Sequence, residues 1–306
     1  MTAVRKKKKT VKSLAYGRPP TVQRPKSISR KATKALINEH HLLEKRRAQA
    51  AAKGDITAVA AADAEIAALG GLETYQQASL QGQRNDRGGD SSRVLMDWLK
   101  PVLSTLGSSA AAVTAAAEAA KATESLRMLE VGALSTNNEC SRSNLFDVSR
   151  IDLNSQSQGI LQQDFMKRPL PVDDTERFDI ISLSLVLNFV PDAEGRGQML
   201  FRTLEFLKLP VKDTSSRLRE LLPSLFMVLP APCVTNSRYM DEANLEAIMN
   251  ALGYTKVRSK TTHKLVYYLW TRESPTPEHI PIFKKAEVRS GRSRNNFSIV
   301  LRGASG

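Results

Sequence analysis

The stretch "RMLEVGALSTNN", residues 127–138, decides how this chain is expected to fold. An apolar run ends at Val131 and passes at once into Gly132, as a buried strand passes into the first turn of a βα unit. Gly132 has no side chain, so its backbone can come close to a ligand. The stretch therefore predicts a strand at 126–131 with a ligand site at its carboxyl end.

The rest of the carboxyl-terminal half alternates between strand and helix patterns. Apolar, β-rich runs indicate strands at 145–152, 178–190, 224–234 and 263–272, and amphipathic runs indicate helices at 192–208 and 241–253. The run at 178–190 is almost continuous, as expected for a strand that is covered on both faces. This alternation is typical of a mostly parallel sheet with helices on both sides, so we predict an α/β fold.

Asp152 is the second candidate ligand-binding residue, because it ends the predicted second strand 20 residues after Gly132. A carboxylate at that place can accept hydrogen bonds from both hydroxyls of a ribose. The residues from Leu134 onward lack the further glycines of G-x-G-x-x-G, which seat the diphosphate of a dinucleotide on a helix amino terminus. S-adenosylmethionine has a ribose and an adenine but no phosphate, so this cofactor is favoured over NAD.

Asp164, in "LQQDFM", is the third candidate. Its carboxylate is placed to accept a hydrogen bond from the adenine amino group of such a cofactor. The alternative is an aspartate that only caps a turn. The sequence leaves both interpretations open.

Several long strings stand out in this chain: "LEVGALSTNN", "RIDLNS", "FDIISLSLVLNFVPDAEGRGQML" and "LPAPCVTNSRYM". They closely resemble the fungal 25S ribosomal RNA adenine-N(1) methyltransferase family, and the resemblance covers roughly residues 72–272. It implies a Rossmann-like methyltransferase fold, S-adenosylmethionine as cofactor, and cofactor-binding roles for Gly132 and Asp152. It also implies 25S rRNA, within a pre-60S particle, as the partner, and a location in the nucleus and nucleolus.

Two loops are candidates for binding the base and the RNA. Adenine N1 carries a lone pair and no proton, so its methylation needs alignment and tolerance of positive charge rather than a strong base. In "LNFVP", Asn188 is expected to hydrogen-bond the base and Phe189 to stack on it, although core packing is the alternative for Phe189. In "TNSRY", Arg238 is expected to contact a phosphate and Tyr239 a base, unless this loop only caps the next helix.

The positive charge of the chain is concentrated at its amino terminus. Of 45 Lys and Arg and 31 Asp and Glu, residues 1–47 hold 15 and 2, so they contribute +13 of the net +14. Such a tail attracts polyanions and suits a nuclear address. We expect a disordered basic arm at 1–32, a helical region with alanine-rich inserts at 33–125, the cofactor-binding domain at 126–272 and a tail at 273–306.

The region before the first strand is expected to be helical. Helix patterns cover 33–49, where His40 and His41 are expected at the surface, and the alanine-rich stretch 48–71, which ends at a glycine pair. A further helix at 92–107 has Ser92 as its expected N-cap and carries Trp98 on an apolar stripe that suits core packing. The preceding "RGGDSS", 87–92, either folds over the cofactor or is a flexible lead-in.

Composition excludes several classes of protein. Cys140 and Cys233 have neither zinc-finger spacing nor enough partners for a disulfide framework, so we expect a reduced, intracellular compartment and no metal site. No run reaches the roughly 18 apolar residues of a membrane span, and no secretory signal is expected. Two alternatives remain, a methyltransferase acting on a ribosomal protein and an assembly factor that has kept the fold without the cofactor. A monomer is assumed.

Overall fold

The computed structural model describes residues 29–71, 74–75, 77–78, 90–106, 125–155, 157–210 and 219–302. Most of the expected basic arm and the alanine-rich insert at 108–122 lie outside these residues. The first part of "RGGDSS", 87–89, lies outside them as well. The division of the chain at residues 32, 125 and 272 therefore stays a prediction.

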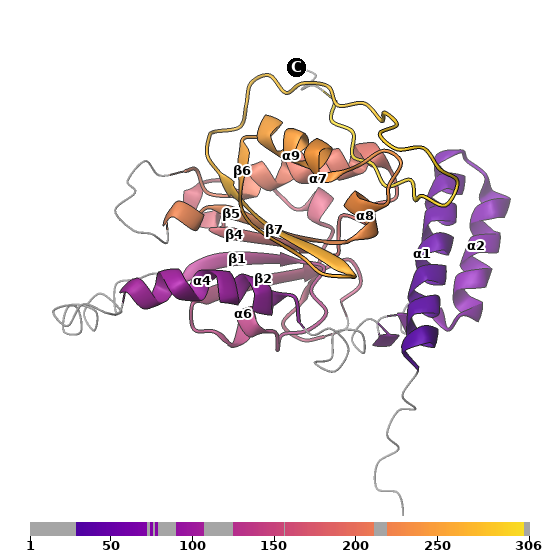
Figure 1. Ribbon diagram of the computed structural model, residues 1–306. Helices are drawn as coiled ribbons and strands as arrows, with labels where there is room; N and C mark the ends of the chain where they lie inside the picture. Colours follow the sequence, from indigo (N-terminus) through magenta and orange to yellow (C-terminus); the bar gives the residue numbers. More distant parts are fainter. Residues whose placement is uncertain are drawn as a thin grey trace, which may run out of the picture.

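A seven-stranded sheet with the order β3-β2-β1-β4-β5-β7-β6 forms the centre of the molecule (Figure 1). The strands are β1 Leu126–Val131, β2 Phe146–Asp152, β3 Leu161–Gln162, β4 Ile180–Ser184, β5 Ser224–Pro230, β6 Tyr254–Thr261 and β7 Leu265–Arg272. The five strands from β3 to β5 pair in parallel, whereas β7 is antiparallel to both β5 and β6. The predicted α/β fold with a mostly parallel sheet is confirmed.

Helices cover both faces of this sheet. The helices of the described residues are α1 Arg30–Ala52 and α2 Ile56–Ala68, which lie beside the sheet, and α4 Ser92–Leu106, α6 Glu139–Arg142, α7 Ala193–Phe206, α8 Pro232–Thr235 and α9 Glu242–Ala251, with 3-10 turns η1 Phe165–Lys167, η2 Asp174–Glu176 and η3 Arg219–Leu221. Leu129 and Ile181 pack under α7 and α9, and their chain neighbours Met128 and Ile180 pack under α4. Successive strand residues point to opposite faces, so both faces of the sheet are apolar.

Two of the expected elements are shorter than their sequence patterns. The run 178–190 forms a strand only as far as Ser184, because Leu185 has a φ of 58° and turns the chain out of the sheet. The run 224–234 leaves the sheet after Pro230 and continues as α8. Some side chains beyond each strand are still buried, among them Leu187 and Val234, so an apolar pattern does not reveal where the strand stops.

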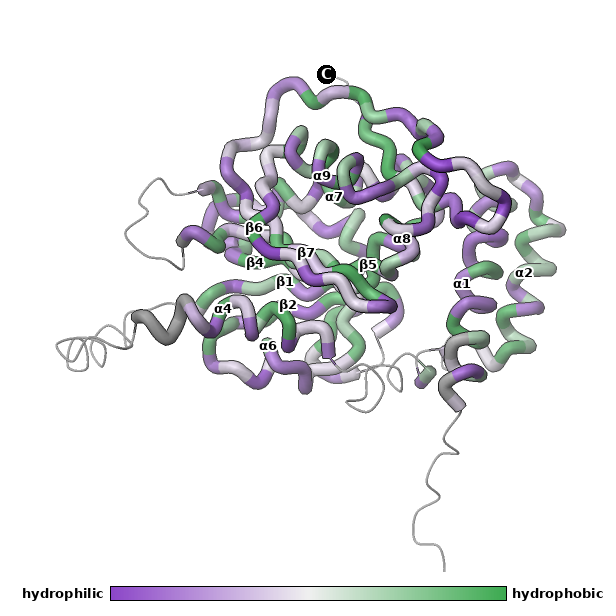
Figure 2. The backbone as a smooth tube through the Cα atoms, in the orientation of Figure 1, coloured by the Kyte–Doolittle hydropathy of each residue, from purple (hydrophilic) through white to green (hydrophobic). Residues whose placement is uncertain are grey.

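The alanine-rich stretch 48–71 is two helices rather than one. Gly54 adopts a φ of 72° after α1, and the side chain of Asp55 accepts a hydrogen bond from the Ala58 amide to start α2. Figure 2 shows that α2 is mostly hydrophobic, whereas hydrophilic and hydrophobic residues alternate along α1. The two helices form a hairpin that lies beside the carboxyl ends of the parallel strands (Figure 1).

The start of α4 also differs from the prediction. Ser92 is the first helical residue instead of the N-cap, and Asp90 accepts hydrogen bonds from the Ser92 amide at 2.9 Å and its hydroxyl at 2.6 Å. The expected core packing of Trp98 is confirmed, because its ring meets that of Phe226 in β5 edge to face, with the ring centres 6.0 Å apart.

Residues 273–302 return across α7 and α9 and reach the hairpin side of the molecule (Figure 1). Phe297, Ile299 and Leu301 are buried. The Val300 amide donates to the Ala193 carbonyl at 2.9 Å, and a Cβ on Gly197 of α7 would lie 2.0 Å from the Val300 carbonyl oxygen. This close approach of two backbones requires a glycine.

Candidate functional site

The parallel strands bring their carboxyl ends together at one edge of the sheet. Gly132 follows β1, Asp152 ends β2, Leu185 follows β4 and Ala231 follows β5. In open α/β sheets, ligands bind outside this edge, where neighbouring loops separate. The sequence candidates therefore lie on loops that face the same side of the sheet.

Gly132 has the conformation that its turn requires. Its φ is 74°, a left-handed value that costs other residues roughly 1–2 kcal/mol. The amides of Gly132 and Ala133 both donate to the Ile151 carbonyl, at 2.8 Å and 3.1 Å, which fixes the turn against the end of β2. A Cβ on Gly132 would lie 2.7 Å from Cγ2 of Val186. The predicted glycine turn is present, and contact with a ligand stays a prediction.

Asp152, at the end of β2, uses one of its two carboxylate oxygens in a hydrogen bond with a described residue. Its Oδ1 accepts the Asn154 amide at 2.8 Å, and no donor among the described residues contacts Oδ2. Burial raises the pKa of Asp152, and the hydrogen bond from Asn154 opposes this rise. A partly buried carboxylate with one oxygen that makes no such hydrogen bond is suited to accept hydrogen bonds from the hydroxyl groups of a ligand.

Asp164 has the structural role that the sequence left as the alternative. It is the N-cap of η1, and its Oδ1 accepts the Met166 amide at 2.8 Å. The same carboxylate has a second oxygen, so the cap does not conflict with the predicted contact to an adenine amino group. That contact stays a prediction.

Glu130, two residues before Gly132, is a charged residue of the site that our sequence reasoning missed. Its two carboxylate oxygens accept hydrogen bonds from Nδ2 of Asn138 at 2.8 Å and 2.9 Å. Burial raises the pKa of Glu130 to about 7, and the charge of Asp90 adds to the rise, whereas Asn138 and Arg150 oppose it. The signal that could have pointed to it is a single carboxylate within the otherwise apolar strand end "LEV".

The segment before α4 joins the same edge of the sheet. The Ser91 hydroxyl lies 2.8 Å from that of Ser184 at the end of β4, and Asp90 accepts the Glu139 amide at 2.7 Å. Residues 90–92 therefore dock between β4 and α6. For these three residues the structure favours a fixed position over a flexible lead-in.

The loop after β4 holds Asn188 and Phe189. The Phe189 amide donates to the Val186 carbonyl at 2.9 Å, which closes a tight turn over residues 187–189. The Asn188 side-chain oxygen is buried and has no hydrogen-bond partner among the described residues. Phe189 is 42% exposed, so core packing, the alternative for this ring, is not what the structure has. Roles for both residues in binding a base stay predictions.

The expectation that His40 and His41 lie at the surface is wrong for His40, which is buried, whereas His41 is half-buried. His40 is 3% exposed and stacks on Tyr75, with ring centres 4.4 Å apart. His41 stacks on Phe189 at 3.7 Å. Their burial depends on residues that are distant in the sequence, so the local pattern of α1 did not reveal it.

Arg238 and Tyr239 connect the loop after α8 to the carboxyl-terminal segment. Nε of Arg238 donates to the Gly291 carbonyl at 3.1 Å, and its amide donates to the Asn295 carbonyl at 3.0 Å. The Lys285 ammonium lies 4.2 Å from the centre of the Tyr239 ring. The structure thus gives both residues an anchoring role, and RNA contact stays a prediction.

Residues 60–299 match the family model described as 25S rRNA (adenine(2142)-N(1))-methyltransferase, Bmt2. The matched region includes Gly132, Asp152 and both loops that follow β4 and β5. The chain belongs to this family.

Two fungal relatives of the Bmt2 family align with most of the chain. The Saccharomyces cerevisiae protein named 25S rRNA (adenine(2142)-N(1))-methyltransferase is 38% identical over 240 residues, which are 78% of this chain and 62% of that protein. The Schizosaccharomyces pombe protein named 25S rRNA adenine-N(1) methyltransferase is 37% identical over 271 residues, which are 88% and 91% of the two chains. The chain therefore spans less than two thirds of the budding-yeast relative.

A solved structure with a partly similar backbone is the 1,6-didemethyltoxoflavin-N1-methyltransferase of Burkholderia thailandensis. It superposes with a TM-score of 0.38 and 13% identity, over 60% of this chain and 89% of that chain. A similarity of this degree carries no argument about ligand or reaction.

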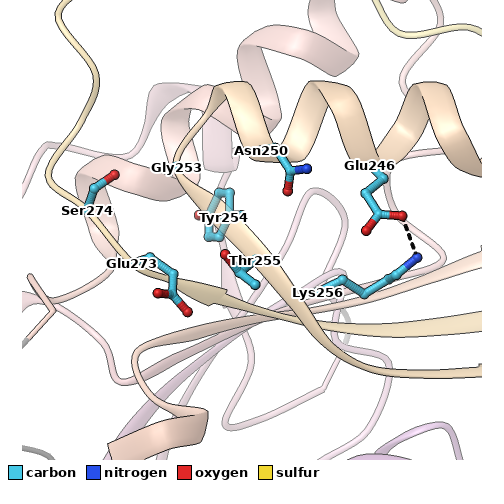
Figure 3. A pocket seen from close by; sticks show the side chains of 8 residues that line it. All are labelled: Glu246, Asn250, Gly253, Tyr254, Thr255, Lys256, Glu273 and Ser274. Atoms are coloured by element: carbon cyan, nitrogen blue, oxygen red, sulfur yellow. Dashed lines mark hydrogen bonds and ion pairs between the residues drawn. The ribbon is translucent and has the colours of Figure 1, made fainter.

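A surface pocket of this Bmt2-family chain lies away from the site. Its lining includes Glu246, Gly253 and Glu273, near the start of β6 and the end of β7 (Figure 3). Because β7 is antiparallel to β5, this is the opposite edge of the sheet. The Lys256 ammonium is already paired there with Glu246 at 2.8 Å. The pocket is not where the candidate residues meet.

Two further classes of feature are absent from the described part of this Bmt2-family chain. Within those ranges, no group of three or more His, Cys, Asp or Glu side chains is arranged to hold a metal ion. None of the described helices has both the length and the hydropathy needed to cross a membrane.

Proposed function

We propose that this protein is an S-adenosylmethionine-dependent methyltransferase that methylates N1 of a specific adenine in 25S rRNA. The observation that carries the proposal is the family match over residues 60–299, which contains Gly132 and Asp152 in the arrangement that suits a ribose. Both fungal relatives are named for this reaction. The adenine that corresponds to the one in the family description is the expected target.

The residues at the strand ends fit this cofactor. Gly132 has the positive φ that the tight turn after β1 requires, Asp152 keeps one oxygen for ribose hydroxyls, and Asp164 keeps one for the adenine amino group. The cofactor, when bound, supplies a methyl group on a positively charged sulfur. These side chains hold and orient it, and the missing glycines matter little because no diphosphate has to be seated.

The chain's own task in the reaction is to align the base. Adenine N1 needs no deprotonation before it is methylated, so the absence of an obvious general base among the described site residues does not conflict with this reaction. The unpartnered Asn188 oxygen is suited to accept a hydrogen bond from the adenine amino group. Phe189 offers an exposed ring on which the base stacks.

The substrate has to present an accessible Watson–Crick edge. Paired RNA hides this edge, so the adenine is unpaired or is extruded from its helix. The +13 charge of residues 1–47 attracts the rRNA backbone independently of sequence. We place the protein in the nucleolus, where it acts on a pre-60S particle.

Primer extension on rRNA is the direct test. Reverse transcriptase stops at N1-methyladenine, so cells without the protein should lose one stop in 25S rRNA, and the wild-type protein should restore it. Asp152→Ala should bind labelled S-adenosylmethionine poorly and fail to restore the stop. If all stops persist while the protein binds the cofactor, methylation of a ribosomal protein replaces our proposal. If the wild type binds no cofactor, the assembly-factor alternative replaces it.

A further inference from the structure

Four aromatic rings connect the amino-terminal helices to the loop after β4. The ring of His41 lies on that of Phe189 with centres 3.7 Å apart and planes 22° apart. Tyr75 meets His41 edge to face at 5.0 Å and stacks on His40 at 4.4 Å. The name aromatic ladder is used below for these four residues.

The two histidines of the aromatic ladder are held without charge. Burial, together with a smaller effect of repulsion from His40, lowers the pKa of His41 to about 3. Burial also lowers the pKa of His40, whereas Glu44 opposes the shift. Both ring nitrogens of His40 and Nε2 of His41 are buried without a hydrogen-bond partner among the described residues. Buried nitrogens without a partner are unfavourable, so hydrogen bonding does not account for the positions of these two rings, and the aromatic contacts remain as the interaction that holds them.

Phe189 combines a stacked neighbour with an exposed surface. The ring of His41 stacks on that of Phe189, yet 42% of Phe189 remains exposed. Asn188, its neighbour in the chain, has a buried side-chain oxygen that lacks a hydrogen-bond partner among the described residues. A purine base with an amino group fits this pair of residues, because its face can stack on Phe189 and its amino group can donate to the Asn188 oxygen once that side chain turns outward.

We propose that His41 is a positioning residue. Its neutral ring stacks on the Phe189 ring and holds it in the orientation in which the target adenine stacks on Phe189, so that Phe189 serves as the stacking platform for this base. The inference rests on the proposed function and adds α1, which precedes the region matched by the family model, to the substrate site. Methylation at N1 gives the adenine a positive charge, and the face of an aromatic ring attracts a cation. A neutral ring behind Phe189 preserves this attraction, whereas a positive charge there would oppose it.

Substitutions of His41 separate shape from charge. His41→Phe keeps a flat neutral ring, His41→Arg keeps a flat group that stacks but is positively charged, and His41→Ala removes the support. Turnover and KM for an RNA containing the target adenine are measured together with cofactor affinity. We expect His41→Phe to lie within about twofold of the wild type and His41→Arg to lose about three- to thirtyfold in kcat. His41→Ala should raise KM, and all three variants should bind the cofactor as the wild type does.

A binding measurement keeps the inference separate from the proposed reaction. RNA with 2-aminopurine in place of the target adenine loses fluorescence when this base stacks on an aromatic ring. Wild type and His41→Phe should quench it, and His41→Ala should not. If the wild type quenches the signal but transfers no methyl group to RNA, the proposed function fails while the platform stands.

Three results would overturn the inference. The first is equal kcat for His41→Phe and His41→Arg, which removes the argument from charge. The second is equal quenching by His41→Ala and the wild type, which removes the support of Phe189. The third is loss of cofactor binding in His41→Phe as well as in His41→Ala, which makes the role of the ring purely structural.

Discussion

Replacing Glu130 with glutamine should stabilise the protein at pH 8 and change its stability little near pH 4.5. In the folded protein the pKa of Glu130 is raised to about 7 from an ordinary value of 4.5. Between these two values the folded protein holds a proton that the unfolded chain has released, so stability falls as the pH rises through this interval. The fall is about 3.5 kcal/mol, at about 1.4 kcal/mol for each unit of pKa. Above pH 7 it is complete.

Glutamine carries no charge, so this fall disappears in Glu130→Gln. The two hydrogen bonds from Asn138, at 2.8 Å and 2.9 Å, favour the charged carboxylate, and the pKa of about 7 already includes their effect. The expected gain of Glu130→Gln at pH 8 is therefore the full fall of about 3.5 kcal/mol. Against a typical total stability of about 5–15 kcal/mol, a difference of this size is readily measured.

Urea unfolding at pH 5, 6, 7 and 8 measures the difference between Glu130→Gln and the wild type. We expect the variant to gain stability relative to the wild type at each step from pH 5 to 7, with a constant difference above that. Asp147→Asn removes a carboxylate from an exposed position of β2 and should not show this trend. A difference that is the same at every pH, or that shrinks toward pH 8, would show that burial of the Glu130 charge does not limit stability.

Three further predictions concern the turn, the base and the RNA. Gly132→Ala should lose more stability than Gly54→Ala, because φ is similar at the two sites, 74° and 72°, but only Gly132 has an obstacle, Cγ2 of Val186 at 2.7 Å. Adding Val186→Ala should recover this extra loss in urea unfolding, and no recovery would mean that the contact is unimportant. Asn188→Ala should lower kcat by about tenfold or more while cofactor affinity and melting temperature stay unchanged, since its oxygen has no partner to lose. Equal loss of turnover and cofactor affinity would contradict that role. Arg238→Ala should weaken RNA binding and reduce the slope of log affinity against log salt by about one, whereas a purely anchoring residue would leave the slope unchanged.

Much of the fold follows from local sequence patterns. The strand at 126–131, the glycine turn after it and the strand that ends at Asp152 are all where their patterns predict. These features depend on residues close together in the chain, because strand alternation and backbone freedom at glycine act over a few positions. The positive charge of the first 47 residues is likewise a property of composition alone.

Other features depend on contacts between distant segments. The apolar run 178–190 does not reveal that the chain leaves the sheet at Leu185, because apolar residues continue after the turn and one of them, Leu187, is buried. The pattern of α1 does not show that His41 meets Phe189, nearly 150 residues later in the chain. The pKa of Glu130 depends on Asp90, Asn138 and Arg150, which only folding brings together. The sequence by itself determined the first two strands, the glycine turn and the charge of the arm, because each depends on neighbouring residues. Only the tertiary structure decided which side chains share the site and which are uncharged, because burial and electrostatic interaction act across space.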